Sequence, residues 1–145
     1  MKGRILLVED NPSDAKLARL AFKRGGIFGP IDVIRDGCQV LDYLLCTGRH
    51  SQRAGELPAL TLLDLNLPCI DGFEVLRRIR AEPRVAFMPV IVLTSSLEFQ
   101  DLSRGYELGA NAYVQKPVDF ERFIDAARAL GNFWLMLNRS PSNLR

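Results

Sequence analysis

The chain has 145 residues, which is the size of one domain that can bury roughly two-thirds of its unfolded surface around a single core. Its 19 Lys and Arg residues nearly balance its 17 Asp and Glu residues, so nucleic acid is not an expected partner. The longest apolar runs are far shorter than the ~20 residues that a membrane span needs, and the first residues lack a signal-peptide core. We therefore expect a cytoplasmic protein with no membrane partner.

The cysteines and the histidine limit which metal sites and catalytic groups the chain can form. Cys38, Cys46 and Cys69 are odd in number and lack the CxxC spacing of a zinc or redox site, so we expect reduced, small, buried side chains. His50 is the only histidine, and no thiol lies at ligand spacing from it. The sequence therefore excludes a histidine metal cluster and a Ser-His-Asp triad.

The first predicted unit is a buried strand, an acidic turn and a helix. Residues 4–8 form the strand, and Glu9 and Asp10 follow its carboxyl end. Asn11 is a good N-cap and Pro12 suits the first helical position. The helix stops at a glycine pair, and its predicted apolar face comprises Leu17, Ala18, Ala21 and Phe22.

The second unit is weaker in its pattern. Residues 31–34 are predicted to form a strand, and the helix that follows carries an apolar stripe of Val40, Leu41, Leu44 and Leu45. Residues 47–57 are polar and are predicted to form a surface loop. Their basic side chains leave open a docking edge for a partner, although a solvated loop is the simpler interpretation.

The central strand ends in a lone carboxylate. Residues 62–63 complete an apolar run, Asp64 follows, and Pro68 and Gly72 open a loop before a helix at residues 73–82. In an open α/β sheet, ligands bind at the carboxyl edge of the strands, so Asp64 is placed to act as a nucleophile or a ligand. Taken alone, an Asp that caps a turn explains the pattern equally well.

The rest of the chain continues the alternation. The fourth strand, residues 90–93, ends in Thr94, and a helix follows. The fifth strand, residues 112–115, leads directly to Lys116. The last helix begins near Asp119, and its predicted inward residues are Phe120, Phe123, Ile124, Ala127, Leu130, Trp134 and Leu137.

Five strands alternating with five helices predict an α/β fold, a doubly wound parallel sheet covered on both faces. We assign residues 1–137 to this domain and residues 138–145 to a polar tail, and we expect no output domain.

Polar groups follow four of the strands, and parallel strands place their carboxyl ends at one edge of the sheet. The residues predicted to converge there are Glu9, Asp10, Asp64, Thr94 and Lys116. Three carboxylates close together repel one another unless a hard cation lies among them, and oxygen-only ligands favour Mg²⁺ or Mn²⁺. The predicted ligands are Glu9, Asp10, Asp64 and the backbone carbonyl of Asn66.

This set of groups suits phosphoryl transfer. A bound Mg²⁺ neutralises phosphoryl oxygens while Asp64 attacks phosphorus to give an aspartyl phosphate. Lys116 supplies a positive charge to a phosphate oxygen, and Thr94 supplies a hydroxyl that bonds the product. Each residue alone has an ordinary explanation as a surface lysine, a strand end or a helix-start acid, so the convergence carries the prediction.

Four motifs agree with one family. Val8-Glu9-Asp10-Asn11, Leu63-Asp64-Leu65-Asn66-Leu67-Pro68 with Asp71-Gly72, Leu93-Thr94-Ser95 and Lys116-Pro117 resemble the CheY-like receiver domain of two-component response regulators. The resemblance covers the chain to about Leu137. It implies a flavodoxin-like (βα)5 fold with strand order 2-1-3-4-5, and phosphorylation of Asp64 by a histidine kinase. It implies Mg²⁺ held by the acidic residues, and a cis peptide between Lys116 and Pro117.

The resemblance also implies a conformational switch. The family uses an aromatic residue three positions before the lysine, and Tyr113 occupies that position. Phosphate would draw Thr94 toward it, and Tyr113 would rotate into the vacated space. A half-buried strand aromatic is the alternative explanation. In the family the phosphate lifetime depends on flanking side chains, here Asn66 and Ser96, and Ser95 also flanks the site.

A narrower resemblance concerns the partner. The stand-alone receivers that partner bacterial and cyanobacterial phytochrome kinases resemble this chain in four segments: Leu41-Asp42-Tyr43-Leu44, Leu93-Thr94-Ser95-Ser96, Lys116-Pro117-Val118-Asp119 and Phe133-Trp134-Leu135. Val118 replaces the Phe that is commonest in receivers generally. This resemblance implies a phytochrome histidine kinase as the partner. Because we expect no output domain, we expect output by protein contact or by onward phosphotransfer.

The end of the last helix is apolar almost all round. Phe133, Leu135 and Met136 fall off its inward stripe, and such a patch often marks a partner surface. We expect a homodimer or a kinase-docking face that involves Phe133, Trp134, Leu135 and Met136.

Three other functions fit the sequence less well. A haloacid dehalogenase-type phosphatase needs a second acid two residues after the nucleophile, where this chain has Asn66, and its nucleophile follows the first strand rather than the third. A flavodoxin-like flavin binder needs a phosphate loop, which Glu9 and Asp10 would repel. A scaffold with a silent site is disfavoured because all five key positions are present.

Overall fold

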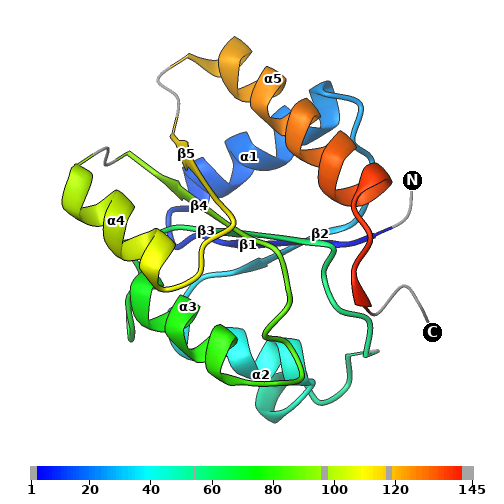
Figure 1. Cartoon of the computed structure of the whole chain (residues 1–145). Helices are drawn as coiled ribbons and strands as arrows, with labels where there is room; N and C mark the ends of the chain where they lie inside the picture. The colour runs from blue at the N-terminus through cyan, green and yellow to red at the C-terminus, as the bar shows by residue number, and fades with distance from the viewer. Residues whose placement is uncertain (1–2, 54, 96–97, 117–118, 142–145) are drawn as a thin grey trace.

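One five-stranded parallel sheet organises the molecule (Figure 1). The computed structural model describes residues 3–53, 55–95, 98–116 and 119–141. The spatial order of the strands is β2-β1-β3-β4-β5, and every neighbouring pair is parallel, which confirms the predicted flavodoxin-like fold. The strands are β1 (Ile5–Val8), β2 (Ile31–Ile34), β3 (Leu60–Leu63), β4 (Val90–Thr94) and β5 (Ala112–Gln115).

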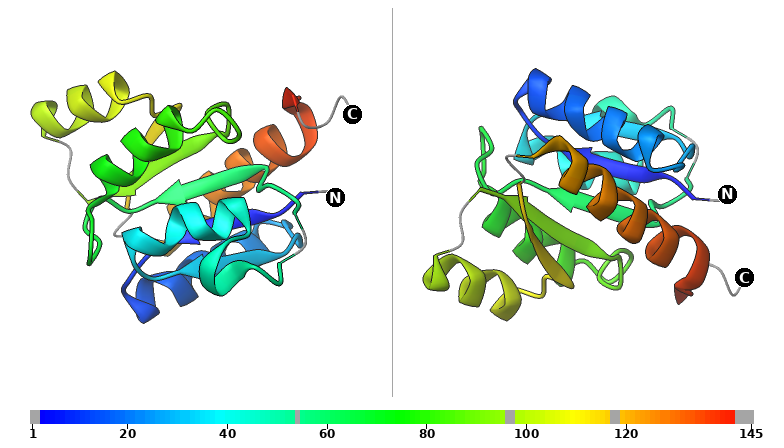
Figure 2. Two further views of the ribbon diagram at one scale, coloured as in Figure 1. Left: turned by 90° about the horizontal axis from the view of Figure 1, so that it is seen from below. Right: turned by 90° about the horizontal axis from the view of Figure 1, so that it is seen from above.

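Helices cover both faces of this sheet. Helices α1 and α5 lie on one face and α2, α3 and α4 on the other, as the opposed views of Figure 2 show. The helices are α1 (Pro12–Arg24), α2 (Val40–Leu45), α3 (Gly72–Ala81), α4 (Phe99–Glu107) and α5 (Phe120–Gly131). Short 3₁₀ turns form η1 (Gly37–Gln39) and η2 (Gly48–His50), and the π-helical turn η3 (Asn132–Leu137) extends α5. No helix in the described ranges is long and apolar enough to cross a membrane.

The central strands are fully buried because helices cover both of their faces, and their residues are accordingly apolar on both sides. The register places Val8 beside Ile34 on one side and beside Leu63 on the other. Leu63 in turn pairs with Val92. The carboxyl ends of these strands therefore meet at one edge, and the chain leaves each of them there as a polar loop.

Local chemistry fixes where α1 begins beside this edge. The Asn11 side chain accepts hydrogen bonds from the backbone N–H groups of Ser13 and Asp14, at 2.9 and 3.1 Å, and Pro12 occupies the first turn. Both predictions for this helix start are confirmed. The cap matters for the site because it sets the direction in which the first turn of α1 presents its side chains.

Three predictions about the faces of helices were wrong, one in α1 and two at the end of the last helix. Leu17 is 45% exposed, and Ala15 takes the buried position instead, so α1 packs against the sheet through three alanines and Phe22. Leu137 is 72% exposed because the chain widens to a π-helix after Gly131, which changes the residue spacing per turn and rotates the last residues. The same rotation turns Leu135, predicted to face outward, into contact with the core cluster beside Gly3.

The cysteine prediction was also wrong for two of the three residues. Cys38 and Cys69 are exposed and form a disulfide, with their Cα atoms 5.8 Å apart. The physical reason is topological: β2 and β3 both flank β1, so the turn after β2 and the loop after β3 lie side by side. Cys46 is a free, half-buried thiol at the end of α2.

The polar segment after α2 is folded back onto that helix. The Arg53 guanidinium donates to the backbone carbonyls of Tyr43 and Glu56, at 2.9 and 2.7 Å, and lies over the Tyr43 ring with its central carbon 4.1 Å from the ring centroid. Arg53 therefore acts as a tether between this loop and α2, which favours the loop interpretation of the segment over a docking edge.

Candidate functional site at the carboxyl edge of the sheet

Two buried carboxylates mark the ends of neighbouring strands. Glu9 follows β1 and is 3% exposed, and Asp64 follows β3 and is 6% exposed. Backbone hydrogen bonds hold both residues in register with the sheet: Glu9 N donates to Ile34 O, and Asp64 N donates to Val8 O, each at 3.0 Å. Asp10, the next residue after Glu9, is exposed at the same edge.

These carboxylates lie close enough to share one cation. Oxygen atoms of Glu9, Asp10 and Asp64 lie within 4.8 Å of one another. The donor set is hard oxygen without thiolate or imidazole, which fits Mg²⁺ or Mn²⁺ better than zinc. The structure thus brings together the three predicted side-chain ligands. The fourth predicted ligand is the backbone carbonyl of Asn66. This residue lies next to the cluster, because its backbone N–H donates to Asp64 Oδ1 at 3.3 Å.

Lys116 reaches into the same cluster from β5. Its Nζ lies 2.5 Å from Glu9 Oε1, 3.1 Å from Asp14 Oδ2 and 3.2 Å from Asp64 Oδ2. The backbone of Lys116 is held by its N–H, which donates to the Thr94 carbonyl at 2.7 Å and so continues the pairing of β4 with β5. Residues more than one hundred positions apart therefore form one ionic cluster, as predicted.

Burial and charge shift the acid–base properties of this cluster. Burial is the main reason that the pKa of Glu9 is raised to about 7, and the nearby Asp64 carboxylate adds to the rise while the Lys116 hydrogen bond opposes it. Burial alone would lower the pKa of Lys116, but the carboxylates around its ammonium raise it above its usual value. Lys116 therefore stays charged, and Glu9 is the group that titrates near neutral pH.

Sequence reasoning missed Asp14 as a member of this cluster. Asp14 lies in the first turn of α1, and its carboxylate contacts the Lys116 ammonium at 3.1 Å. Its contact depends on the angle at which Asn11 starts the helix. The sequence does place an acid four residues after Asp10, in the first turn of a capped helix. An acid at that position also interacts favourably with the helix dipole, so it needs no other partner to explain it.

The predicted switch residues lie on β4 and β5. Thr94 ends β4, next to β3, and is 1% exposed. Tyr113 on β5 is half-buried against α4, where a Cβ on Gly105 would lie 3.1 Å from its ring. The Tyr113 hydroxyl is buried and has no hydrogen-bond partner among the described residues, and the ring of Tyr106 lies 6.3 Å away. Burial raises the pKa of Tyr113.

Some predicted site features cannot be placed. Ser96, Pro117 and Val118 lie outside the described residues, and with them the predicted cis peptide after Lys116. Ser95 is described and exposed at the end of β4, and Asn66 is exposed in the loop after β3. Both positions agree with a flanking role beside Asp64.

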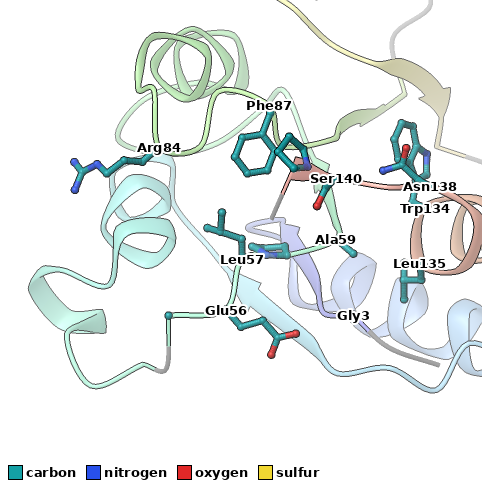
Figure 3. Close-up of a pocket in the computed structure, with 13 residues that line it drawn as sticks. Gly3, Glu56, Leu57, Ala59, Arg84, Phe87, Trp134, Leu135, Asn138 and Ser140 are labelled. Carbon is teal, nitrogen blue, oxygen red and sulfur yellow. The ribbon is translucent and has the colours of Figure 1, made fainter. Parts of the chain in front are cut away.

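Two further features lie away from this cluster. Asp36, Cys38 and Cys69 also lie within ligand distance of one another, but the two sulfur atoms are joined in the disulfide and are not thiolates. A cavity of about 700 Å³ lies at the opposite edge of the sheet, between the residues that precede β1, β3 and β4 and the end of the last helix (Figure 3). Leu57, Phe87 and Trp134 line it.

The arrangement at the carboxyl edge can do one kind of chemistry well. Asp64 offers a carboxylate oxygen in a mostly buried position, and Lys116 places a positive charge 3.2 Å from it. The other oxygen ligands for a hard cation, Glu9 and Asp10, have carboxylate oxygens within 4.8 Å of an Asp64 oxygen. A carboxylate nucleophile flanked by positive charges suits attack on a phosphoryl group, whose transfer depends on positioning and charge stabilisation.

Comparison with known proteins agrees with this geometry. The sequence profile of the family described as "Response regulator receiver domain" matches residues 5–128. The chain is similar to the probable methanogenesis regulatory protein FilR2 of Methanothrix harundinacea, with 44% identity over 94% of this chain and 86% of FilR2.

Two solved structures extend the comparison. The chain resembles the phosphorylated cyanobacterial phytochrome response regulator RcpA with a TM-score of 0.87 and 33% identity, covering 97% of this chain and 99% of RcpA. It also resembles the Mn²⁺-bound form of the response regulator Rcp1, a protein of Synechocystis, with a TM-score of 0.84 and 34% identity over 97% of this chain and 99% of Rcp1.

Proposed function

The chain belongs to the response regulator receiver family, and from this premise we propose that it accepts a phosphoryl group from a histidine kinase on Asp64. One observation carries the proposal: the ammonium of Lys116 lies 3.2 Å from the Asp64 carboxylate, inside a cluster that also holds Glu9 and Asp10. An isolated strand-ending Asp would need neither a cation nor further acids around it.

The proposed reaction uses the residues as follows. An oxygen of Asp64 attacks phosphorus as the bond to the donor breaks, and an acyl phosphate forms. The Lys116 ammonium lies beside a phosphoryl oxygen, and the Thr94 hydroxyl donates to another. A divalent cation held by Glu9, Asp10, Asp64 and the Asn66 carbonyl neutralises charge on the phosphoryl oxygens when it is bound. The only reactions that we assign to the chain are its own phosphorylation and dephosphorylation.

The proposed output is a change in the surface formed by α4, β5 and α5. The buried Tyr113 hydroxyl has no hydrogen-bond partner among the described residues, which costs about 1–3 kcal/mol in a folded protein. Small movements of Thr94 that open space beside β4 can therefore bias the ring between two positions. We infer that phosphorylation acts through this pair, and that the altered surface signals by protein contact or by passing the phosphoryl group on.

The proposed phosphorylation is tested by intact mass spectrometry. The protein is incubated with acetyl phosphate and Mg²⁺, and wild type should gain the mass of one phosphoryl group. Asp64→Asn should gain none, and omission of the divalent cation should prevent the gain in wild type. Asp125→Asn is the matched control, because Asp125 is an exposed acid on α5, away from the cluster. A wild-type protein that never gains the mass would refute the proposal.

We propose a phytochrome histidine kinase as the partner, because solved structures similar to this chain include phytochrome response regulators. The similarity to FilR2 gives reason to test the choice directly. Phosphotransfer rates from a panel of kinases are measured, and a phytochrome kinase should be the fastest donor. Preference for another kinase would remove this part of the proposal. We also propose a cytoplasmic location, where a kinase has access to ATP.

We propose that the end of the last helix forms a homodimer. Phe133 is 48% exposed and Met136 is 62% exposed on η3, and both are apolar. Trp134 and Leu135 are half-buried against the domain and contribute only their outer edges. Light scattering should report a dimer for wild type and a smaller species for a Phe133→Ser, Met136→Ser variant. A wild-type monomer at high concentration would contradict the dimer.

A further inference from the structure

A disulfide joins the two loops that lie beside the phosphoryl-acceptor site. Cys38 lies in η1, directly after β2, and Cys69 lies in the loop between β3 and α3, 31 residues later in the chain. The backbones of the two loops are also in contact, since Gly37 N donates to Pro68 O at 3.1 Å. The pair therefore closes an existing contact rather than forcing two distant segments together.

This disulfide is not buried in the core, as structural disulfides often are. Both cysteines are exposed and line a shallow hollow of about 540 Å³ together with Arg49 and two acids, Asp36 and Asp42. A small thiol compound can thus reach the sulfur atoms. Glutathione carries both kinds of charge, so Arg49 can contact one of its carboxylates while Asp36 and Asp42 can contact its ammonium group. Exposed disulfides are the ones that exchange readily with small thiols, whereas structural ones resist reduction.

The loop that carries Cys69 also forms part of the acceptor site. It begins at Asp64 and includes Asn66, whose N–H bonds the Asp64 carboxylate. It ends at the start of α3, where Gly72 N donates to Leu65 O at 2.9 Å. Cys69 itself has a φ of 75°, which is rare for a residue other than glycine. The disulfide holds this loop in one conformation, so its loss gives the loop more freedom.

We propose that Cys38 and Cys69 form a reversible redox modification site for low-molecular-weight thiols and disulfides, and that its oxidised state favours phosphorylation of Asp64. The second half of this inference rests on the function proposed above. The first half, reversible exchange at the two sulfur atoms, stands without it.

The exchange is balanced with glutathione disulfide as the oxidant. The thiolate of one cysteine attacks a sulfur of glutathione disulfide, which forms a mixed disulfide and releases one glutathione thiolate. The second cysteine thiolate then attacks the protein sulfur of that mixed disulfide and releases the second glutathione. Two protein thiols are oxidised, one glutathione disulfide is reduced, and the two thiol protons end on the two glutathione molecules.

The third cysteine gives an internal control. Cys46 is a free thiol that lies half-buried at the end of α2. It should count as one free thiol in every redox state. The number of free thiols should therefore change between one and three without a stable intermediate.

The exchange is tested by thiol trapping. The protein is equilibrated with graded ratios of reduced to oxidised glutathione in the presence of a chelator, and free thiols are capped with a maleimide and counted by intact mass. We expect reversible loss and gain of two thiols together, and a trapped glutathione adduct on Cys69 in Cys38→Ser. Independent reaction of the two thiols would overturn the inference. So would a disulfide that persists in a large excess of reduced glutathione.

The coupling is tested by phosphorylation rates with acetyl phosphate and Mg²⁺. The oxidised protein should react about threefold or more faster than the reduced protein, because small displacements of a reacting group slow transfer strongly. Cys46→Ser should keep this difference. The double variant Cys38→Ser, Cys69→Ser should react slowly in both oxidising and reducing buffer. Equal rates in the two wild-type states would refute the coupling. Failure of both states to react would refute the proposed function, while the thiol counts would still decide the exchange.

Discussion

Replacing Lys116 with Gln removes the ammonium that contacts three carboxylates. Glu9 and Asp64 are almost completely buried, and the Lys116 side chain is 21% exposed. Removing one partner of a buried ion pair costs 3–5 kcal/mol, and partial exposure of the lysine favours the lower end of this range. We expect Lys116→Gln to lower the free energy of unfolding by about 3 kcal/mol at about pH 8 in the absence of divalent cation.

The loss should depend on pH because Glu9 titrates. The pKa of folded Glu9 is about 7, above the ordinary 4.5, so the folded protein binds more protons than the unfolded chain between these values. The contribution of Glu9 to stability is therefore fully present below about pH 4.5 and is lost as the pH rises through about 7. Without Lys116 the pKa of Glu9 rises further, so this fall in stability continues to higher pH. At about pH 5.5, where Glu9 is protonated, the variant should lose only about 1 kcal/mol.

Urea denaturation followed by circular dichroism measures these differences. Wild type and Lys116→Gln are compared at both pH values with a chelator, and again with saturating Mg²⁺ at the higher pH. Mg²⁺ should stabilise the variant more than wild type, because it replaces the missing positive charge. Lys16→Gln is the matched control on the exposed side of α1, and it should change stability by less than about 0.5 kcal/mol. Equal losses at the two pH values would refute the electrostatic reasoning.

Three further measurements test other parts of the structure. Glu9→Gln should flatten the pH dependence of stability between about pH 4.5 and 7, where wild type loses at most about 3 kcal/mol, and urea titrations at several pH values decide this. Gly72→Ala should lower the free energy of unfolding by about 2 kcal/mol, because the added Cβ would collide with the Asp64 carbonyl, whereas Gly55→Ala, with open space around it, should be neutral in the same assay. Reduction of the Cys38–Cys69 disulfide should lower the free energy of unfolding by about 3–4 kcal/mol, measured by urea denaturation with and without dithiothreitol.

The strand ends were predictable because the sequence marks them in two independent ways. The apolar runs before Glu9 and Asp64 stop abruptly at a carboxylate, and Pro or Gly follows within a few residues. The right-handed parallel topology then brings these ends to one edge, whatever the details of the helices. Lys116 was predictable for the same reason, since it directly follows β5.

The remaining site features depend on geometry that spacing does not encode. Asp14 contacts Lys116 only because the first turn of α1 leaves the sheet at one angle. The Cys38–Cys69 pair required knowledge that η1 and the loop after β3 touch, and a count of cysteines cannot supply it. The change to a π-helix after Gly131 altered the faces of the last turn, and a helical wheel with constant spacing missed it.

Charge explains why the proposed reaction should need a divalent cation. Glu9, Asp14 and Asp64 contact the ammonium of Lys116, and Asp10 lies beside Glu9 and Asp64. The fully ionised cluster of these five residues therefore carries three excess negative charges before any phosphoryl group arrives. Burial makes this excess costly, and the raised pKa of Glu9 shows that the cluster reduces it by keeping a proton. A cation that takes Glu9 as a ligand must displace this proton. The affinity for Mg²⁺, and the phosphorylation that depends on it, should therefore weaken as the pH falls below about 7.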